Sequence, residues 1–258
     1  MTGHSFNPLS VHVASSRSAM GARAAADIAS EIRALLARQQ GVRIMFAAAP
    51  SQSEMLQSLT GSPGVEWSRV TAFHMDEYLD LAVDAPQRFG AWLRRTIFDH
   101  QPFGAVHLIE TDGLPSQIAA DYAVKLNAAP IDIVCCGVGV NGHLAFNDPP
   151  ADFRDPHTVK VVALDERSRQ QQVDDKCFAS IQNVPTHAVT VTIPTLLAAH
   201  TIFCTVPGAQ KNCAIRDMLE RPVTSLCPAT ALRLHPRCTL YLDRESANGV
   251  AVEDYRQV

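Results

Sequence analysis

The chain has 258 residues, of which 47% are hydrophobic and 19% charged, and its formal net charge is −4. Such a composition is typical of a globular protein with a buried core, and it argues against nucleic acid or an anionic membrane as a partner. No apolar run has the length of a membrane span, and the opening MTGHSFNPLS lacks the basic start and apolar core of a signal peptide. We therefore expect a cytoplasmic protein.

Apolar, strand-like runs alternate with amphipathic, helix-like segments along the chain. The first half predicts helices over 16–41, 51–61, 86–100 and 116–129, separated by strands over 42–50, 68–75, 105–110 and 131–139. The second half predicts strands over 158–164, 186–193, 201–208 and 238–243, with helices over 165–180, 194–199 and 209–220. Because this alternation favours parallel strands with helices packed on both sides, we expect an α/β fold. The prediction is a single domain over 1–258, with a Rossmann-like, doubly wound, mostly parallel sheet and helices on both faces.

The cysteines do not predict disulfides or a metal site. There are seven, an odd number, and no two of them form a C-x-x-C pair. Cys135 and Cys136 are neighbours on a predicted strand, so they should point to opposite faces of the sheet. We expect buried free thiols, with no metal bound.

Polar clusters follow four of the predicted strands. In doubly wound folds, ligands bind outside the carboxyl ends of the strands, and parallel strands share that edge. We therefore expect the four clusters to meet at one site. They are PSQS at 50–53, HMDEY at 74–78, GVGVNGHLAFNDPP at 137–150 and PGAQK at 207–211.

Two of these clusters open predicted helices, where free backbone N–H groups and the helix dipole favour an anion. Ser51, Gln52 and Ser53 would supply polar groups there, and Lys211 a positive charge. The alternative is that the serines only cap a helix and that the lysine is a solvated surface charge. The phosphate loop of nucleotide-binding proteins is absent, and G-x-G lacks the third glycine of a dinucleotide loop.

The other two clusters carry groups that can move protons. Asp76 and Glu77 point apart if the strand continues, so one could face a site as a base while the other is paired or solvated. A helix-start acid pair is the alternative interpretation. His143, with Asn141 and Asp148 nearby, could pass protons to a hydroxyl, or it could be a loop histidine bound to backbone beside a turn. The flexible backbone of this loop comes from Gly137, Gly139 and Gly142.

FHMDEYLDL followed by GVGVNGHLAFNDPP resembles the glucosamine-6-phosphate deaminase (isomerase) family. VPTHAVTVTIPTLL, GAQKNCAI and ALRLHPRCTLYLD extend the resemblance from about Arg43 to Asp243. The sister family, 6-phosphogluconolactonase, has a similar G-x-G-x-D-G-H loop but lacks MDEY. The resemblance implies isomerisation of a small phosphorylated amino sugar with loss of ammonia, without a metal or redox cofactor. It also suggests self-association as a homo-oligomer, in a family whose members range from monomers to hexamers.

The resemblance also implies roles for individual residues. Asp76 would be the base that moves a proton from C2 to C1, and His143, held by Asp148 and Asn141, would assist ring opening. The phosphate would be bound by Lys211, the 51–53 turn and Arg169.

The sequence departs from the family pattern at three places. AAPSQSE replaces a turn rich in Gly, Thr and Ser, Asp148 replaces the usual Glu, and Asn141 stands where members carry Asp or Asn. Two other functions are therefore alternatives, a lactonase-like hydrolase and a non-catalytic sugar-phosphate sensor. Retention of Asp76 argues against the first, because lactone hydrolysis needs no base at C2. The lack of a basic recognition helix argues against the second.

Overall fold

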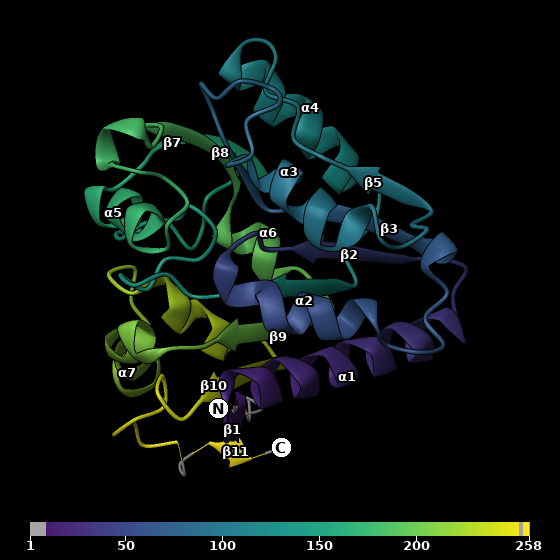
Figure 1. Ribbon diagram of the computed structural model, residues 1–258, viewed down its shortest axis with the longest axis vertical. Helices are drawn as coiled ribbons and strands as arrows, with labels where there is room; N and C mark the ends of the chain where they lie inside the picture. The colour runs from purple at the N-terminus through teal and green to yellow at the C-terminus, as the bar shows by residue number, and fades with distance from the viewer. Residues whose placement is uncertain (1–8, 253–254, 258) are drawn as a thin grey trace, which may run out of the picture.

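The computed structural model describes residues 9–252 and 255–257, so the opening segment 1–8 lies outside the described residues. An eight-stranded sheet, in which every strand pair is parallel, runs through the molecule in the order β11-β1-β10-β9-β6-β2-β3-β5 (Figure 1). This confirms the predicted α/β fold with a parallel sheet. The strands are β1 (Ser10–Ala14), β2 (Val42–Phe46), β3 (Val70–His74), β5 (Ala105–His107), β6 (Ile133–Cys136), β9 (Thr201–Val206), β10 (Cys238–Asp243) and β11 (Arg256–Gln257).

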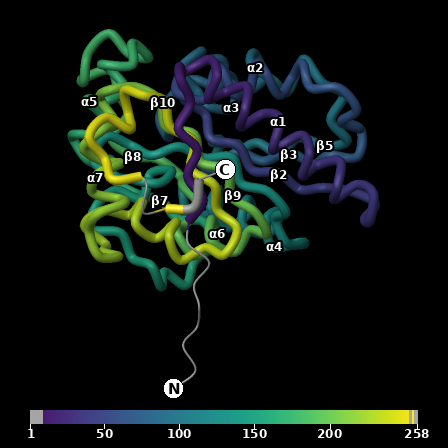
Figure 2. Tube along the Cα trace, turned by 90° about the horizontal axis from the view of Figure 1, so that it is seen from below, coloured from purple at the N-terminus to yellow at the C-terminus, as the bar shows by residue number. Residues whose placement is uncertain are grey.

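Helices cover both faces of this sheet, with α1, α2 and α3 on one side and α4 and α6 on the other (Figure 2). The longest, α1, begins after Ser16, whose side chain accepts a hydrogen bond from the N–H of Ala19 and so caps the first turn. The helices are α1 (Arg17–Leu36), α2 (Ser53–Thr60), α3 (Phe89–Leu93), α4 (Pro115–Asn127), α5 (Glu166–Asp174), α6 (Ile193–Leu197) and α7 (Asn212–Glu220).

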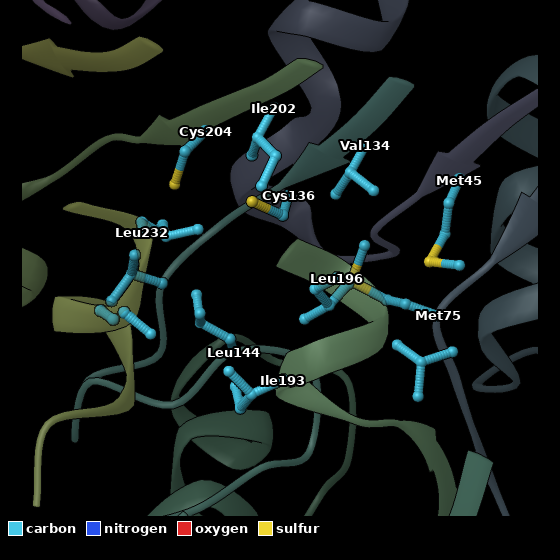
Figure 3. Packing of buried hydrophobic residues seen from close by; sticks show 14 of the residues in the cluster. Met45, Met75, Val134, Cys136, Leu144, Ile193, Leu196, Ile202, Cys204 and Leu232 are labelled. Atoms are coloured by element: carbon cyan, nitrogen blue, oxygen red, sulfur yellow. The ribbon is translucent and has the colours of Figure 1, made fainter. Parts of the chain in front are cut away.

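The two cores follow from the alternation of side chains along the strands. Ile44 of β2 packs beneath α1 and α2, whereas its neighbour Met45 packs into the opposite core. Cys135 and Cys136 separate in the same way, as the sequence predicted. Figure 3 shows Cys136 and Met45 in this opposite core, against which α4, α6 and α7 pack.

A second, antiparallel sheet is the main departure from the predicted architecture. Its three strands are β4 (Asp76–Tyr78), β8 (His187–Val191) and β7 (Val159–Ala163), in that order. The runs 158–164 and 186–193 were predicted as strands of one mostly parallel sheet, and 76–78 as part of a polar cluster after a strand. These strands lie apart from the main sheet, with α5 beside them (Figure 1).

Several predicted elements are shorter or more irregular than the sequence pattern indicated. The predicted helix over 86–100 is a turn followed by α3 and a π-helical segment, η3 (Arg94–Phe98). Two helices at the carboxyl edge of the sheet begin with 3₁₀ turns, η1 (Pro50–Gln52) before α2 and η5 (Ala209–Lys211) before α7. The remaining 3₁₀ turns are η2 (Trp67–Arg69), η4 (Ile181–Asn183) and η6 (Pro228–Leu234).

Candidate active site

A cavity lies at the carboxyl edge of the parallel sheet, where β2, β3, β6 and β9 end. All four polar clusters that follow these strands contribute to its wall, so the sequence correctly predicted that they meet. The wall is formed by Ala47, Ala48, Ala49, Ser51, Gln52, Met75, Asp76, Phe89, Gly137, Val138, Gly139, His143, Ala145, Phe146, Gln171, Gln172 and Lys211.

Asp76 is the acid that faces the cavity. Its backbone pairs with Thr190 in β8, which holds the carboxyl in place at the start of β4. The side chain is buried and makes no hydrogen bond to any group in the described part of the chain. Burial, followed by the nearby charge of Glu77, raises the pKa of this carboxyl well above its ordinary value. A carboxyl whose pKa is raised in this way is a stronger base than an exposed carboxylate, as a group that takes up a proton must be.

Glu77 points away from the cavity and is fully engaged by the protein. Its carboxylate accepts hydrogen bonds from the backbone N–H groups of Tyr78, Phe89 and Gly90, at 2.9–3.0 Å, and lies 3.6 Å from the guanidinium of Arg88. Burial raises the pKa of Glu77, while these N–H groups and Arg88 oppose the rise. The two adjacent acids therefore have separate surroundings, because successive residues of β4 face opposite sides.

His143 lies across the same cavity and is held through one ring nitrogen. Its Nδ1 is 3.1 Å from Asp148 Oδ1 and 2.8 Å from Ser168 Oγ. Ser168 Oγ also donates to Asp148, and the amide of Asn141 donates to Asp148 Oδ1 at 3.0 Å. Because both partners contact Nδ1, Nε2 is left to act on a ligand.

Asp148 is held as a carboxylate. Burial alone would raise its pKa, but hydrogen bonds and charge from His143, together with hydrogen bonds from Ser168 and Asn141, lower the pKa to about 2. Its second oxygen accepts the N–H of Asp165, at the start of α5. An aspartate at this position therefore reaches the histidine directly, despite being one methylene shorter than glutamate.

Glycines make room for this arrangement at two places. A Cβ on Gly139 would lie 2.2–2.4 Å from three ring atoms of His143, so only glycine lets the imidazole pack on this backbone. Gly142 has a φ of +83°, which side chains rarely adopt, and its Cβ position is 2.7 Å from the sulfur of Cys227. The loop geometry thus requires both residues.

Lys211 makes the cavity suited to an anion. Lys211 is only 3% exposed, and its ammonium group has no acid within salt-bridge distance among the described residues. Burial, opposed by the charge of Asp175, lowers the pKa of this lysine to about 8, so it is still charged at neutral pH. The hydroxyl of Ser51 and the side chain of Gln52 contribute to the same wall. A buried cation without a protein partner favours a bound anion.

The sequence matches a known protein family over most of its length. The model of the family described as glucosamine-6-phosphate isomerases/6-phosphogluconolactonase matches residues 15–240. The chain belongs to this family.

Individual relatives within the family are distant in sequence. A glucosamine-6-phosphate deaminase from Arthrobacter sp. (strain FB24) is 31% identical over 235 residues, which cover 88% of each chain. A deaminase of the same name from Bacillus thuringiensis (strain Al Hakam) is 31% identical over 200 residues, 75% of this chain and 74% of the relative. This similarity shows that the chain is an enzyme of carbohydrate metabolism.

Solved structures of the family share the fold over nearly the whole chain. A monomeric glucosamine-6-phosphate deaminase superposes with a TM-score of 0.86 at 25% identity, covering 93% of this chain and 99% of its own. The 6-phosphogluconolactonase from Trypanosoma brucei superposes with a TM-score of 0.79 at 18% identity, covering 96% and 100%. The second comparison concerns the fold alone.

Two residues that were predicted to bind the phosphate do not line the cavity. Arg169 does not line the cavity; its guanidinium donates to the backbone carbonyls of Ile181 and Val184, at 2.7 and 2.9 Å, and so secures the chain after α5. Ser53 is the first residue of α2, and it is also not part of the cavity wall that the described residues form. Of the 51–53 turn, only Ser51 and Gln52 reach the cavity.

Three residues of α5 that belong to the site were not predicted from the sequence. Ser168, Gln171 and Gln172 are buried on one side of this helix, and both glutamines line the cavity. The side-chain oxygen of Gln171 also accepts the N–H of Val140 at 2.9 Å, which ties the helix to the glycine-rich loop. The available signal was the spacing i, i+3, i+4, where a helix that packs on a core would carry apolar residues.

The described residues hold neither a metal-binding cluster nor a helix able to cross a membrane. Among residues 9–252 and 255–257, no group of three His, Cys, Asp or Glu side chains is arranged to hold a metal ion. Within the same part of the chain, no helix combines the length and the apolar character that crossing a membrane requires.

Proposed function

We propose that this enzyme converts glucosamine 6-phosphate into fructose 6-phosphate and ammonia. The observation that carries the proposal is that Asp76 and His143, two groups that can move protons, line one cavity together with the buried cation of Lys211. The names of the relatives from Arthrobacter and Bacillus support the same reaction.

Ring opening is the first step of the proposed reaction. His143 accepts the proton of the C1 hydroxyl through Nε2 and returns a proton to the ring oxygen, which breaks the C1–O5 bond and yields an aldehyde. Asp148 stabilises the transient imidazolium, because its carboxylate lies 3.1 Å from Nδ1. Ser168 and Asn141 keep that carboxylate ionised and oriented.

Asp76 carries out the second step. Its carboxylate removes the proton from C2, and the C1 oxygen takes up a proton from solvent, which gives an enol at C1 beside the C2 amine. The protonated carboxyl then delivers its proton to C1, and the amine nitrogen releases one proton to solvent. The product of this transfer is an imine at C2. Water adds to the imine and ammonia leaves, so that the ketone of fructose 6-phosphate remains. The raised pKa of Asp76 suits a group that must take and give the same proton.

The phosphate end supplies binding energy that does not depend on the reacting carbons. Lys211 and Ser51 bind the phosphate in this proposal, and their contacts position C1 and C2 between His143 and Asp76. Binding energy from a remote group is used to orient the reacting atoms, which raises kcat as well as affinity.

The test is ammonia release and fructose 6-phosphate formation from glucosamine 6-phosphate, with galactosamine 6-phosphate and 6-phosphogluconolactone assayed alongside. Asp76→Asn should lower kcat by about 10²–10⁴-fold while leaving the affinity for fructose 6-phosphate nearly unchanged. The exposed Asp84→Asn is the matched control and should keep wild-type kcat. Hydrolysis of the lactone without ammonia release from either amino sugar would instead assign the lactonase reaction.

A further inference from the structure

Gln52 is the most completely buried polar residue of the cavity wall. It is 0% exposed, and its amide joins the turn after β2 to the end of β9. Thr205 Oγ1 donates to the Gln52 side-chain oxygen at 2.7 Å, and Gln52 Nε2 lies 3.2 Å from the backbone carbonyl of Thr205. The same Nε2 lies 3.2 Å from Ser51 Oγ.

These contacts fix the orientation of the amide. A backbone carbonyl only accepts hydrogen bonds, so the amide atom that faces the carbonyl of Thr205 must be the nitrogen. The oxygen of the amide then faces the Thr205 hydroxyl, which donates to it. One hydrogen of Nε2 is directed at the carbonyl, and the other at Ser51 Oγ.

The direction of the Ser51 hydroxyl follows from this orientation. Because Ser51 Oγ accepts from Gln52, its own hydrogen is free, and the described residues offer no acceptor for it. Ser51 lines the cavity together with Lys211. Gly137 confines the amide from the other side, since a Cβ there would lie 2.7 Å from Gln52 Nε2.

We infer that Thr205 and Gln52 are positioning residues that hold Ser51 as a hydrogen-bond donor to a phosphate group. The relay runs from the Thr205 hydroxyl to the Gln52 oxygen, and from the Gln52 nitrogen to Ser51 Oγ, whose O–H then points at the anion. This inference rests on the proposed function for the identity of the anion. It gives AAPSQSE, which departs from the family pattern, a phosphate-binding role that uses a side-chain relay.

A double-mutant cycle tests the relay with inorganic phosphate as the probe, measured by isothermal titration calorimetry. Ser51→Ala should weaken phosphate binding about tenfold, because a hydrogen bond to a charged group is lost. Thr205→Val, which keeps the shape but removes the donor, should weaken it about fivefold. In the Ser51→Ala background, Thr205→Val should have less than about a twofold further effect.

Two controls separate the relay from a general effect on folding. Thr205→Ser retains the hydroxyl and should restore wild-type affinity. Thr201→Val makes the same substitution at the other end of β9 and should leave phosphate binding unchanged. Melting temperatures of all variants identify any that fail to fold.

Equal losses from Thr205→Val in the wild-type and Ser51→Ala backgrounds would overturn the inference, as would an unaltered affinity in folded Thr205→Val. Absence of phosphate binding by the wild-type enzyme would also overturn it. The proposed reaction has its own test. If the phosphate affinities follow the predicted double-mutant cycle but no ammonia is released from glucosamine 6-phosphate, the relay is supported and the proposed deaminase reaction is refuted.

Discussion

Acidification should destabilise this enzyme through His74, the last residue of β3. Its imidazole is 0% exposed, and Nε2 accepts the backbone N–H of Ile109 at 2.8 Å. Nδ1 must then carry the hydrogen of the neutral ring, and it has no hydrogen-bond partner among the described residues. Burial, followed by the charge of Arg88, lowers the pKa of His74 from 6.5 to about 3.

The size of the effect follows from these two pKa values. The unfolded chain binds a proton at His74 below about pH 6.5, whereas the folded protein does not until about pH 3. The contribution of His74 is therefore fully present above the unfolded pKa and is lost as the pH falls. The loss is about 1.4 kcal/mol per pH unit, or about 2 kcal/mol at about pH 5. It approaches about 5 kcal/mol near pH 3.

Urea denaturation at about pH 7.5 and about pH 5 measures this loss in the wild-type enzyme and in His74→Gln. Glutamine can present its amide oxygen near the position of Nε2 and cannot titrate. The wild-type free energy of unfolding should fall by about 2 kcal/mol more than that of the variant. The exposed His200→Gln should behave as the wild type. Equal losses in wild type and His74→Gln would refute the reasoning.

Three other substitutions test separate parts of the site. Gly139→Ala should lower kcat about 10²-fold with a smaller change in KM, because its Cβ displaces the His143 ring by about 1 Å; an unchanged kcat in steady-state assays would contradict the packing. Since the pKa of Lys211 is about 8, calorimetric affinity for phosphate should fall roughly tenfold between about pH 8 and 9.5. The phosphate affinity of Lys211→Arg should not change over this pH range. A similar fall in the variant would mean that another group titrates. Glu77→Gln should cost about 2–3 kcal/mol of unfolding free energy, measured in urea, because an amide cannot accept all three N–H groups; a loss below about 0.5 kcal/mol would disprove this.

The parallel sheet was predictable because its central strands are apolar on both faces, so β2, β6 and β9 stand out as short runs between amphipathic helices. β4 was not, because three residues carry too little periodicity, and its pairing with β8 depends on contacts between segments far apart in the chain. The partners of β7 and β8 also depend on tertiary contacts, so the sequence pattern did not show that these strands form a separate antiparallel sheet.

The site could be predicted where a residue follows a strand, as Asp76, His143 and Lys211 do, since strand ends converge by topology. The contribution of Ser168 was not predicted, because the buried side of α5 is polar and the i, i+3, i+4 spacing of its residues does not by itself say what the helix packs against. Arg169 shows the converse. Its guanidinium donates to backbone carbonyls instead of facing the cavity, and no local sequence pattern indicates these contacts.

The position of β1 has a consequence for how the chain is made. This strand, Ser10–Ala14, lies between β10 and β11, which are Cys238–Asp243 and Arg256–Gln257. On the ribosome it emerges before every other strand described here, yet both of its neighbours emerge last. Its backbone N–H and C=O groups therefore lack their native hydrogen-bond partners during nearly all of synthesis. Completion of the sheet is thus a late event, and nascent chains that stall before β10 expose an apolar strand edge that chaperones can recognise.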